Sequence, residues 1–309
     1  MSRVSILWVA CLGTAAFPAD VRSEPPCPFA AHNCYSDLGA RMAERRLAEA
    51  LTAGLRHIEV DVNYQPSAGG FVVTHKSDRP PSEPLLHNFL VPLWKTWRSE
   101  PYDHTLIIDL KAGDPTPAGR ALHDYLKEHR DALSRFAPDG TLRSRGPVSV
   151  CLTGSRRIGQ AYLNLAAQEG ELLARRDEGF GGASAREALR RYLRQPPHPG
   201  VGYLTINWNV VVGDQGESQR TGLSGETRAW LTEIVAGARR HGYRLRFYTL
   251  NVRHFSHPGE PLIAGGWDAA WAACVQAGVD MISTDQYTLA VEWWKQIGRK
   301  LNAESWPNP

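Results

Sequence analysis

The sequence predicts an α/β fold, a single (β/α)8 TIM-type barrel. Short apolar runs of strand length alternate with segments of helical apolar spacing along most of the chain, which favours a parallel sheet. There are about eight such units, enough for the sheet to close into a barrel. The chain has 309 residues, a length that suits one barrel of about 250 residues. No repeat of fixed period and no low-complexity linker divides it, so one domain is the simpler interpretation.

The first 24 residues are predicted to be a signal peptide with an undefined cleavage point. A basic residue precedes an apolar stretch over 4–17, which is too short to span a bilayer comfortably. Lipid attachment at Cys11 is not expected, because Trp8 stands where a lipoprotein signal has Leu. The remaining domain, 25–309, is therefore expected to be exported to the periplasm or secreted.

Four cysteines remain after the predicted leader. Cys27 and Cys34 could form a disulfide in an oxidising compartment and close a small loop around His32. The alternative is that Cys34 fills an apolar gap, and both interpretations stay open. Cys151 and Cys274 lie in apolar runs and are predicted to be core residues. No CxxC pattern supports a zinc site.

Histidine and carboxylate side chains, which can transfer protons or bind a metal ion, lie in or directly after the first predicted strands. These elements are a strand over 28–31 that ends in His32, a helix over 38–54, a strand over 56–63 that carries Glu59 and Asp61, and a strand over 71–74 that ends in His75. Alternation along a strand places Glu59 and Asp61 on the same face. Two neighbouring carboxylates repel each other unless a cation or a proton lies between them.

A third acid, Asp109, ends the apolar strand over 105–111 and shares a face with Lys111. The three acids together are interpreted as ligands of one divalent cation. Oxygen ligands favour Mg²⁺ or Ca²⁺ over zinc. The alternative is a salt-bridge network in which Lys111 and Arg56 neutralise the acids.

The rest of the chain continues the alternation of strands and helices. Further strands are predicted over 148–153, 171–175, 202–208, 244–251 and 279–285, and further helices over 85–97, 116–133, from about 156, 184–195, 223–241, 267–277 and 289–301. Ser224 is expected to cap the helix that follows it. A proline-rich segment over 77–84 and a segment over 210–222 are predicted to be loops at the carboxyl ends of strands.

The ordered set His32, Glu59-x-Asp61, His75 and Asp109-x-Lys111 resembles the phosphatidylinositol phospholipase C-like phosphodiesterases, a superfamily that includes the glycerophosphodiester phosphodiesterases. The segment His32-Asn33-Cys34-Tyr35 is similar to the His-Asn-Asp-Tyr motif of one branch. Weaker matches cover 248–251 and 278–285. The resemblance implies a TIM-type barrel, a divalent cation and two catalytic histidines.

Specific roles follow from this resemblance. It implies that His32 and His75 act as the acid and the base, with Lys111 as a third catalytic residue that stabilises charge on the phosphate. A phosphodiester needs both a base and an acid, and imidazoles can serve either role near neutral pH. The expected metal ligands are Glu59, Asp61 and Asp109, and the expected substrate-binding residues are Asn33, Lys111, Trp208, Asn251 and Asp285. Core packing is the alternative for Trp208.

The expected function is hydrolysis of a glycerophosphodiester or a phospholipid headgroup with Mg²⁺ or Ca²⁺ as the cofactor. The expected partner is a small-molecule or lipid phosphodiester, and a transient contact with a membrane surface is compatible with a lipid. A formal net charge of +3 gives no reason to expect a nucleic-acid partner. The alternatives are a non-catalytic protein that binds lipid headgroups or phosphosugars on the same barrel, and a zinc hydrolase, which the shortage of histidine ligands disfavours.

Overall fold

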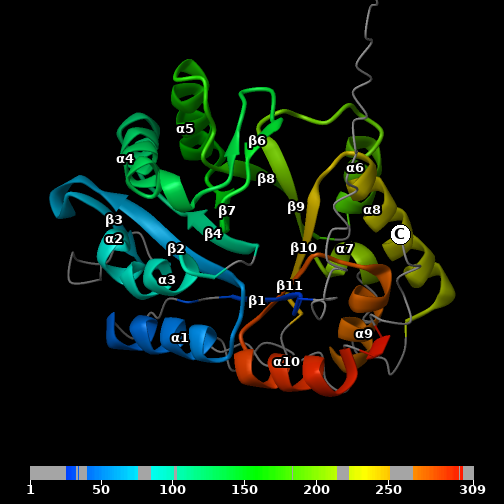
Figure 1. Cartoon of the computed structure of the whole chain (residues 1–309). Coiled ribbons are helices and arrows are strands. Elements are labelled where there is room, and N and C mark those ends of the chain that lie inside the picture. Colours follow the sequence, from blue (N-terminus) through cyan, green and yellow to red (C-terminus); the bar gives the residue numbers. More distant parts are fainter. Residues whose placement is uncertain are drawn as a thin grey trace, which may run out of the picture.

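Parallel strands close into a barrel with helices on the outside in the computed structural model of the chain (Figure 1). The structure describes residues 26–32, 34, 40–75, 85–100, 103–182, 184–213, 223–250, 267–298 and 300–301. The predicted signal peptide lies outside these residues. Within them, no helix has the length and apolar character needed to cross a membrane.

Eight strands form the barrel wall, and each runs parallel to both of its neighbours. In order around the barrel they are β1 (Phe29–Ala31), β2 (His57–Gln65), β4 (His104–Leu110), β7 (Val148–Gly154), β8 (Arg175–Phe180), β9 (Val201–Asn207), β10 (Arg244–Tyr248) and β11 (Met281–Thr284). The short strand β1 closes the barrel, because it pairs with β11 on one side and with β2 on the other. The predicted (β/α)8 barrel is thereby confirmed.

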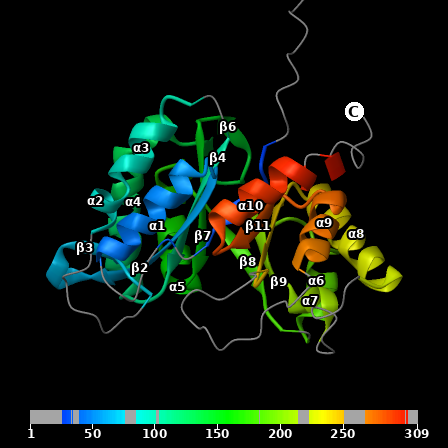
Figure 2. The same ribbon diagram turned by 90° about the horizontal axis from the view of Figure 1, so that it is seen from below.

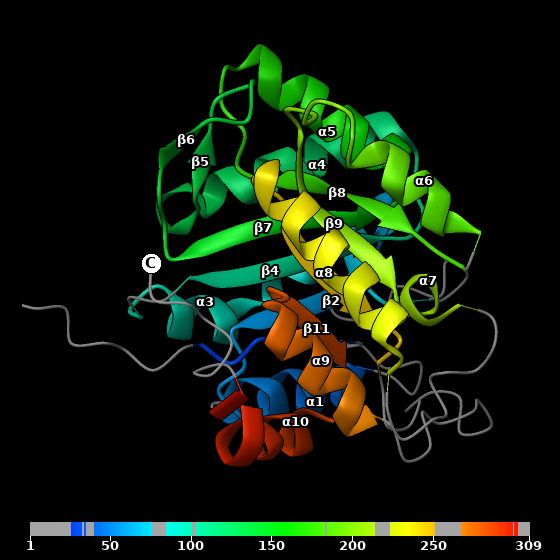
Figure 3. The ribbon, with the colours of Figure 1, turned by 90° about the vertical axis from the view of Figure 1, so that its right-hand side faces the viewer.

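Helices surround this wall, as views from two further sides show (Figures 2 and 3). They are α1 (Ala40–Thr52), α2 (Leu86–Phe89), α3 (Val91–Trp97), α4 (Pro115–Glu128), α5 (Arg156–Gln168), α6 (Ala185–Tyr192), α7 (Asn209–Val212), α8 (Gly225–Arg240), α9 (Trp267–Ala277) and α10 (Tyr287–Trp293), which a π-helix (Trp294–Gly298) continues. Short 3₁₀ turns occupy Pro66–Ala68 and Arg130–Ala132, and a small hairpin is formed by β5 (Arg135–Phe136) and β6 (Leu142–Ser144). The Ser224 side chain accepts a hydrogen bond from the amide of Thr227, as predicted.

Alternation along the strands divides the side chains between two cores. Outward-facing residues of β2, such as Ile58 and Val60, are fully buried among the helices. Inward-facing apolar residues form a separate cluster inside the barrel, made of Ala30, Ile107, Cys151, Tyr203 and Met281. Ile107 precedes Asp109 by two residues on the same face of β4, so this apolar layer lies directly beneath the acidic end of the barrel.

The strand predicted before His75 lies outside the barrel wall. It is β3 (Gly70–Val73), which pairs antiparallel with the end of β2. The resulting hairpin extends beyond the barrel and then returns, because Val73 pairs with Val62 and the amide of Thr74 donates to the carbonyl of Asp61. The hairpin therefore brings His75 back to the level of Asp61.

Several other predicted elements differ from the structure, and the segment predicted as a loop over 210–222 begins within the helix α7. The helix predicted over 85–97 is divided into α2 and α3, with Pro92 in the first turn of α3, where its missing N–H is tolerated. The strand predicted over 171–175 begins only at Arg175 and continues to Phe180. This strand carries more charged residues than a buried parallel strand usually does, so a search for apolar runs did not detect it.

Close packing of α4 on α5 gives a prediction about stability. A Cβ on Gly119 of α4 would lie 2.8 Å from Ala161 Cβ and 2.9 Å from the backbone nitrogen of Tyr162, whereas one on Gly159 of α5 would meet no heavy atom within 4 Å. We expect Gly119→Ala to lower the free energy of unfolding by about 1–3 kcal/mol through overpacking. Gly159→Ala, the matched control, should raise it by about 0.5–1 kcal/mol. Urea unfolding of both variants checks this, and a Gly119→Ala protein as stable as the wild type would contradict it.

Candidate active site

Three carboxylates converge at the carboxyl ends of β2 and β4, where active sites of such barrels lie. Asp61 and Asp109 are partners in the register of the two strands, and Glu59 lies two residues before Asp61 on the same face. One oxygen from each of the three lies within 4.8 Å of the others. Glu59 and Asp61 are buried and Asp109 is partly buried. The structure thus brings together the three acids that the sequence analysis interpreted as metal ligands.

His75 contacts this acidic cluster from the hairpin side. Its Nδ1 lies 2.7 Å from Asp61 Oδ2, and about half of its side chain is exposed, at 48%. The β2–β3 hairpin places the imidazole there by returning to the level of Asp61. His75 thus contacts Asp61 at the open edge of the cluster.

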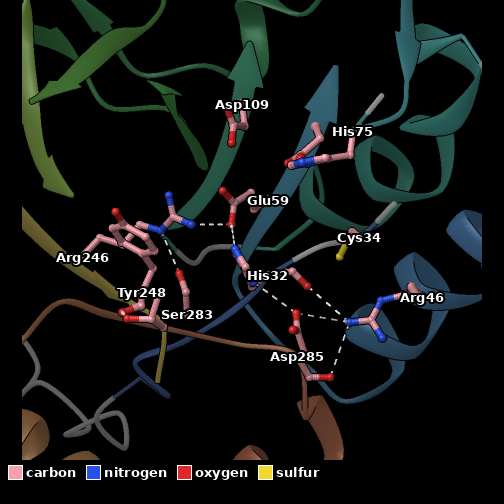
Figure 4. Close-up of polar contacts among 12 residues, drawn as sticks. His32, Cys34, Arg46, Glu59, His75, Asp109, Arg246, Tyr248, Ser283 and Asp285 are labelled. Carbon is pink, nitrogen blue, oxygen red and sulfur yellow. Dashed lines mark hydrogen bonds and ion pairs between the residues drawn. The ribbon is translucent and has the colours of Figure 1, made fainter. Parts of the chain in front are cut away.

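His32 approaches the cluster from the opposite side, at the end of β1 (Figure 4). Its Nδ1 lies 3.1 Å from Asp285 Oδ1, and its Nε2 lies 3.7 Å from Glu59 Oε2. Ala31 pairs with Thr284, so His32 and Asp285 follow neighbouring strands side by side. Burial lowers the pKa of His32, but the charges of Glu59 and Asp285 outweigh it and the pKa lies above its ordinary value.

Two cations neutralise part of the negative charge. Lys111 Nζ lies 2.6 Å from Asp109 Oδ2 and 3.0 Å from Asp61 Oδ2. Burial opposes the charged form of this amine, but the two carboxylates raise its pKa above the ordinary value. Arg246 on β10 is buried, forms an ion pair with Glu59 and donates from Nε to Ser283 Oγ at 2.7 Å.

The alternative of a salt-bridge network is thus correct for one of its two cations. Lys111 contacts the acids as predicted, but the second cation is Arg246 and not Arg56. Arg56 precedes β2 at the opposite end of the barrel. Arg246 was missed by the sequence analysis. A charged residue at an inward position of the apolar strand β10 was the available signal, but the partner Glu59 lies 187 residues away.

The cations do not satisfy both oxygens of Asp109 within the described part of the chain. Asp109 Oδ1 is buried and has no hydrogen-bond partner among the described residues. Burial, and then the charge of Asp61, raises the pKa of Asp109 to about 6. Gly154, with φ of +81°, lies against this oxygen, and a Cβ there would collide with it and with the carbonyl of Leu110. An unpartnered oxygen among three converging carboxylates fits a divalent cation that prefers oxygen ligands, such as Mg²⁺ or Ca²⁺.

A cavity of about 450 Å³ opens beside the cluster. Its walls include His32, Glu59, Asp109, Lys111 and Arg246, whereas His75 is not among its described lining. His32 reaches the cavity from one side. The described lining also includes three cations, Lys111, Arg156 and Arg246, and three acids, Glu59, Asp109 and Asp177.

The far wall of the cavity holds another residue that the sequence analysis missed. Asp177 of β8 is 9% exposed, and its Oδ2 has no hydrogen-bond partner among the described residues. Burial raises the pKa of this carboxyl. Thr205 and Tyr248 line the same region. This wall offers hydroxyl and carboxyl groups for hydrogen bonds beside the ring of Phe180.

The other predicted site residues have different positions. Asp285 lies behind His32 rather than at the mouth of the cavity, because its side chain is fully buried against the imidazole. Trp208 is 1% exposed, packs edge-on against Phe247 and is absent from the described cavity lining, which favours the core-packing interpretation. Asn33 and Asn251 lie outside the described residues.

The proposed disulfide around His32 is not formed. Cys34 is a buried thiol whose Sγ lies 3.4 Å from the hydroxyl of Tyr287. Burial raises the pKa of this thiol to about 12, so it stays protonated near neutral pH. Cys34 therefore fills a gap behind His32, as the alternative held.

Comparison with known proteins bears on the fold. No protein-family model matches the sequence, and a search of curated proteins found no match. Among solved structures, a Ca²⁺-dependent phosphatidylinositol-specific phospholipase C from Streptomyces antibioticus is similar with a TM-score of 0.53 and 16% identity, over 86% of this chain and 95% of that one.

Two glycerophosphodiester phosphodiesterases are also similar. The protein from Agrobacterium tumefaciens str. C58 has a TM-score of 0.42 and 15% identity, over 81% of this chain and 91% of that one. The protein from Parabacteroides distasonis ATCC 8503 has a TM-score of 0.46 and 12% identity, over 89% and 88%. At such identities the likeness to the Streptomyces enzyme concerns the fold. The chain has a barrel similar to that of the Streptomyces enzyme.

Proposed function

We propose that this chain is a divalent-metal-dependent phosphodiesterase that cleaves a glycerophosphodiester or a phospholipid headgroup. One observation carries the proposal: three carboxylates converge at the carboxyl ends of the barrel strands, between two imidazoles that each contact a carboxylate through Nδ1. A protein that only bound phosphate would have no need of two imidazoles beside the same acidic cluster. The fold of a phospholipase C supports the same class of reaction.

The metal would be held by Glu59, Asp61 and Asp109. When bound, Mg²⁺ or Ca²⁺ supplies Lewis-acid polarisation of the phosphate. Lys111 and Arg246 border the same cavity and would stabilise the negative charge that develops on the phosphate oxygens.

His32 and His75 would move the protons. Asp285 and Asp61 accept hydrogen bonds from their Nδ1 atoms, which leaves each Nε2 available for proton transfer. One imidazole takes the proton of the attacking hydroxyl, and the other donates a proton to the leaving oxygen. A hydroxyl of the substrate or a water molecule can be the attacking group. Export of the chain and a lipid as its substrate are proposed from the sequence alone.

The histidines give the first prediction for this function. We expect His32→Ala and His75→Ala each to lower kcat by about 10²–10⁴-fold, because each removes one proton-transfer group. His87, exposed on α2, serves as the matched control, and His87→Ala should retain full activity. Steady-state kinetics and thermal melts of the three variants check this. A fully active double variant of His32 and His75 would refute the mechanism.

The raised pKa of Asp109 gives a prediction about metal affinity. Below about pH 6 this carboxyl holds a proton that a cation must displace, whereas above it the carboxylate is free to bind. The dissociation constant for Ca²⁺ or Mg²⁺ should therefore rise about tenfold per pH unit below 6. Isothermal titration calorimetry between pH 5 and 8 measures it, with Asp109→Asn as a control that binds weakly throughout. A pH-independent affinity would contradict the assignment of Asp109 as a ligand.

Substrate class is tested by incubation with a panel of phosphodiesters. The panel is glycerophosphocholine, glycerophosphoinositol, phosphatidylinositol, sphingomyelin and lysophosphatidylcholine, each with EDTA and with added Mg²⁺ or Ca²⁺. We expect cleavage of at least one member with metal and none with EDTA. Mass spectrometry of the products shows which ester bond breaks and whether a cyclic phosphate forms. Cleavage that is equally fast in EDTA would exclude the metal, and no cleavage of any member would favour a binding protein.

A further inference from the structure

A buried arginine lies behind His32, on the side away from the cavity. Arg46 belongs to α1, which lies beside α10 in the helical layer (Figure 2). Its side chain is only 3% exposed, although arginine is rarely buried unless it is paired. It is absent from the described lining of the cavity, so its role cannot be direct contact with a substrate there.

The guanidinium of Arg46 lies beside His32 and Asp285, which follow β1 and β11 (Figure 4), and it also contacts Tyr287 at the start of α10. Its Nη2 donates to the hydroxyl of Tyr287 at 2.6 Å, to the carbonyl of His32 at 3.3 Å and to the carbonyl of Asp285 at 3.4 Å. The same nitrogen lies 3.7 Å from Asp285 Oδ1. The guanidinium carbon also lies 4.6 Å from the centre of the Tyr287 ring.

These contacts hold the main chain of His32 from both sides. The amide of His32 donates to the carbonyl of Thr284 at 3.0 Å. Its carbonyl accepts from Arg46 and also from the hydroxyl of Tyr287. Because both peptide groups are tied, the direction in which the His32 side chain leaves the backbone is restricted.

Arg46 also has an electrostatic effect on Asp285. The carboxylate of Asp285 is fully buried, and a buried charge is costly unless a compensating charge lies nearby. A neutral imidazole at His32 supplies a hydrogen bond but no charge. The guanidinium of Arg46, 3.7 Å from Asp285 Oδ1, places a positive charge there that favours the anionic form of Asp285, and a carboxylate is a strong acceptor for His32 Nδ1–H.

We propose that Arg46 is a positioning residue for His32. It holds Asp285 ionised and ties the His32 main chain, so that Nδ1–H faces Asp285 and Nε2 faces Glu59 and the cavity. This inference rests on the proposed function in one respect: its effect on turnover requires that His32 transfers a proton. The effect of Arg46 on the orientation and tautomer of the His32 imidazole does not depend on that function.

Kinetics of matched variants test the effect on turnover. We expect Arg46→Met to lower kcat by about 10–100-fold with KM within about twofold, as for other groups that orient an active-site histidine. Arg46→Lys should recover part of kcat, because it keeps the charge but loses the planar fork of donors. Tyr287→Phe, which keeps the ring, should show a smaller loss of kcat. Arg45→Met, at the exposed neighbouring position on α1, is the control and should match the wild type.

Nitrogen-15 NMR of the imidazole tests the positioning without any substrate. In the wild type the neutral His32 ring should be the Nδ1–H tautomer, and in Arg46→Met it should be a mixture of tautomers. If Arg46→Met does not fold, Arg46→Lys and Tyr287→Phe are measured in its place. A folded variant with wild-type kcat and a wild-type His32 spectrum would overturn the proposal. A changed spectrum in a protein that cleaves no phosphodiester would support the positioning and refute the proposed function instead.

Discussion

Burial of several carboxylates at one end of the barrel is the constraint on which this site depends. Glu59, Asp61 and Asp109 lie close together where water is scarce, and Asp177 and Asp285 are buried nearby. Such a cluster is stable only if cations or protons offset its charge. The barrel provides cations from distant parts of the chain, because the inward faces of all its strands meet in one interior.

The cations do not satisfy every carboxylate oxygen. Lys111 contacts one oxygen of Asp109, and Arg246 contacts one oxygen of Glu59. The other oxygen of the partly buried Asp109 has no hydrogen-bond partner within the described part of the chain. Burial and the charge of Asp61 raise the pKa of Asp109, and a further positive charge beside its carboxylate would be favourable. A site with this electrostatic character is suited to a divalent cation and to an anionic phosphate that enters with it.

Much of the fold could be predicted from the sequence, because apolar runs and helical spacing report local burial. The alternation in β2 correctly placed Glu59 and Asp61 on one face, and the ends of the strands indicated His32 and His75. Contacts between distant segments could not be predicted in this way. The pairing of Arg246 with Glu59 and the position of Asp285 behind His32 both depend on the barrel closing, which local patterns do not describe. The antiparallel pairing of β3 with β2 is a local contact across a short turn, but an apolar run such as 71–74 does not by itself define the direction of pairing.

The shortness of β1 has a consequence for how the protein acquires its site. The three residues of β1 join the two edges of the sheet, and His32 follows them directly. Closing the barrel therefore also places this imidazole at the site. A partly folded state in which this strand is detached keeps its other strand pairs and the three carboxylates, yet it lacks one of the two imidazoles. Such an intermediate could bind a cation before it could perform catalysis.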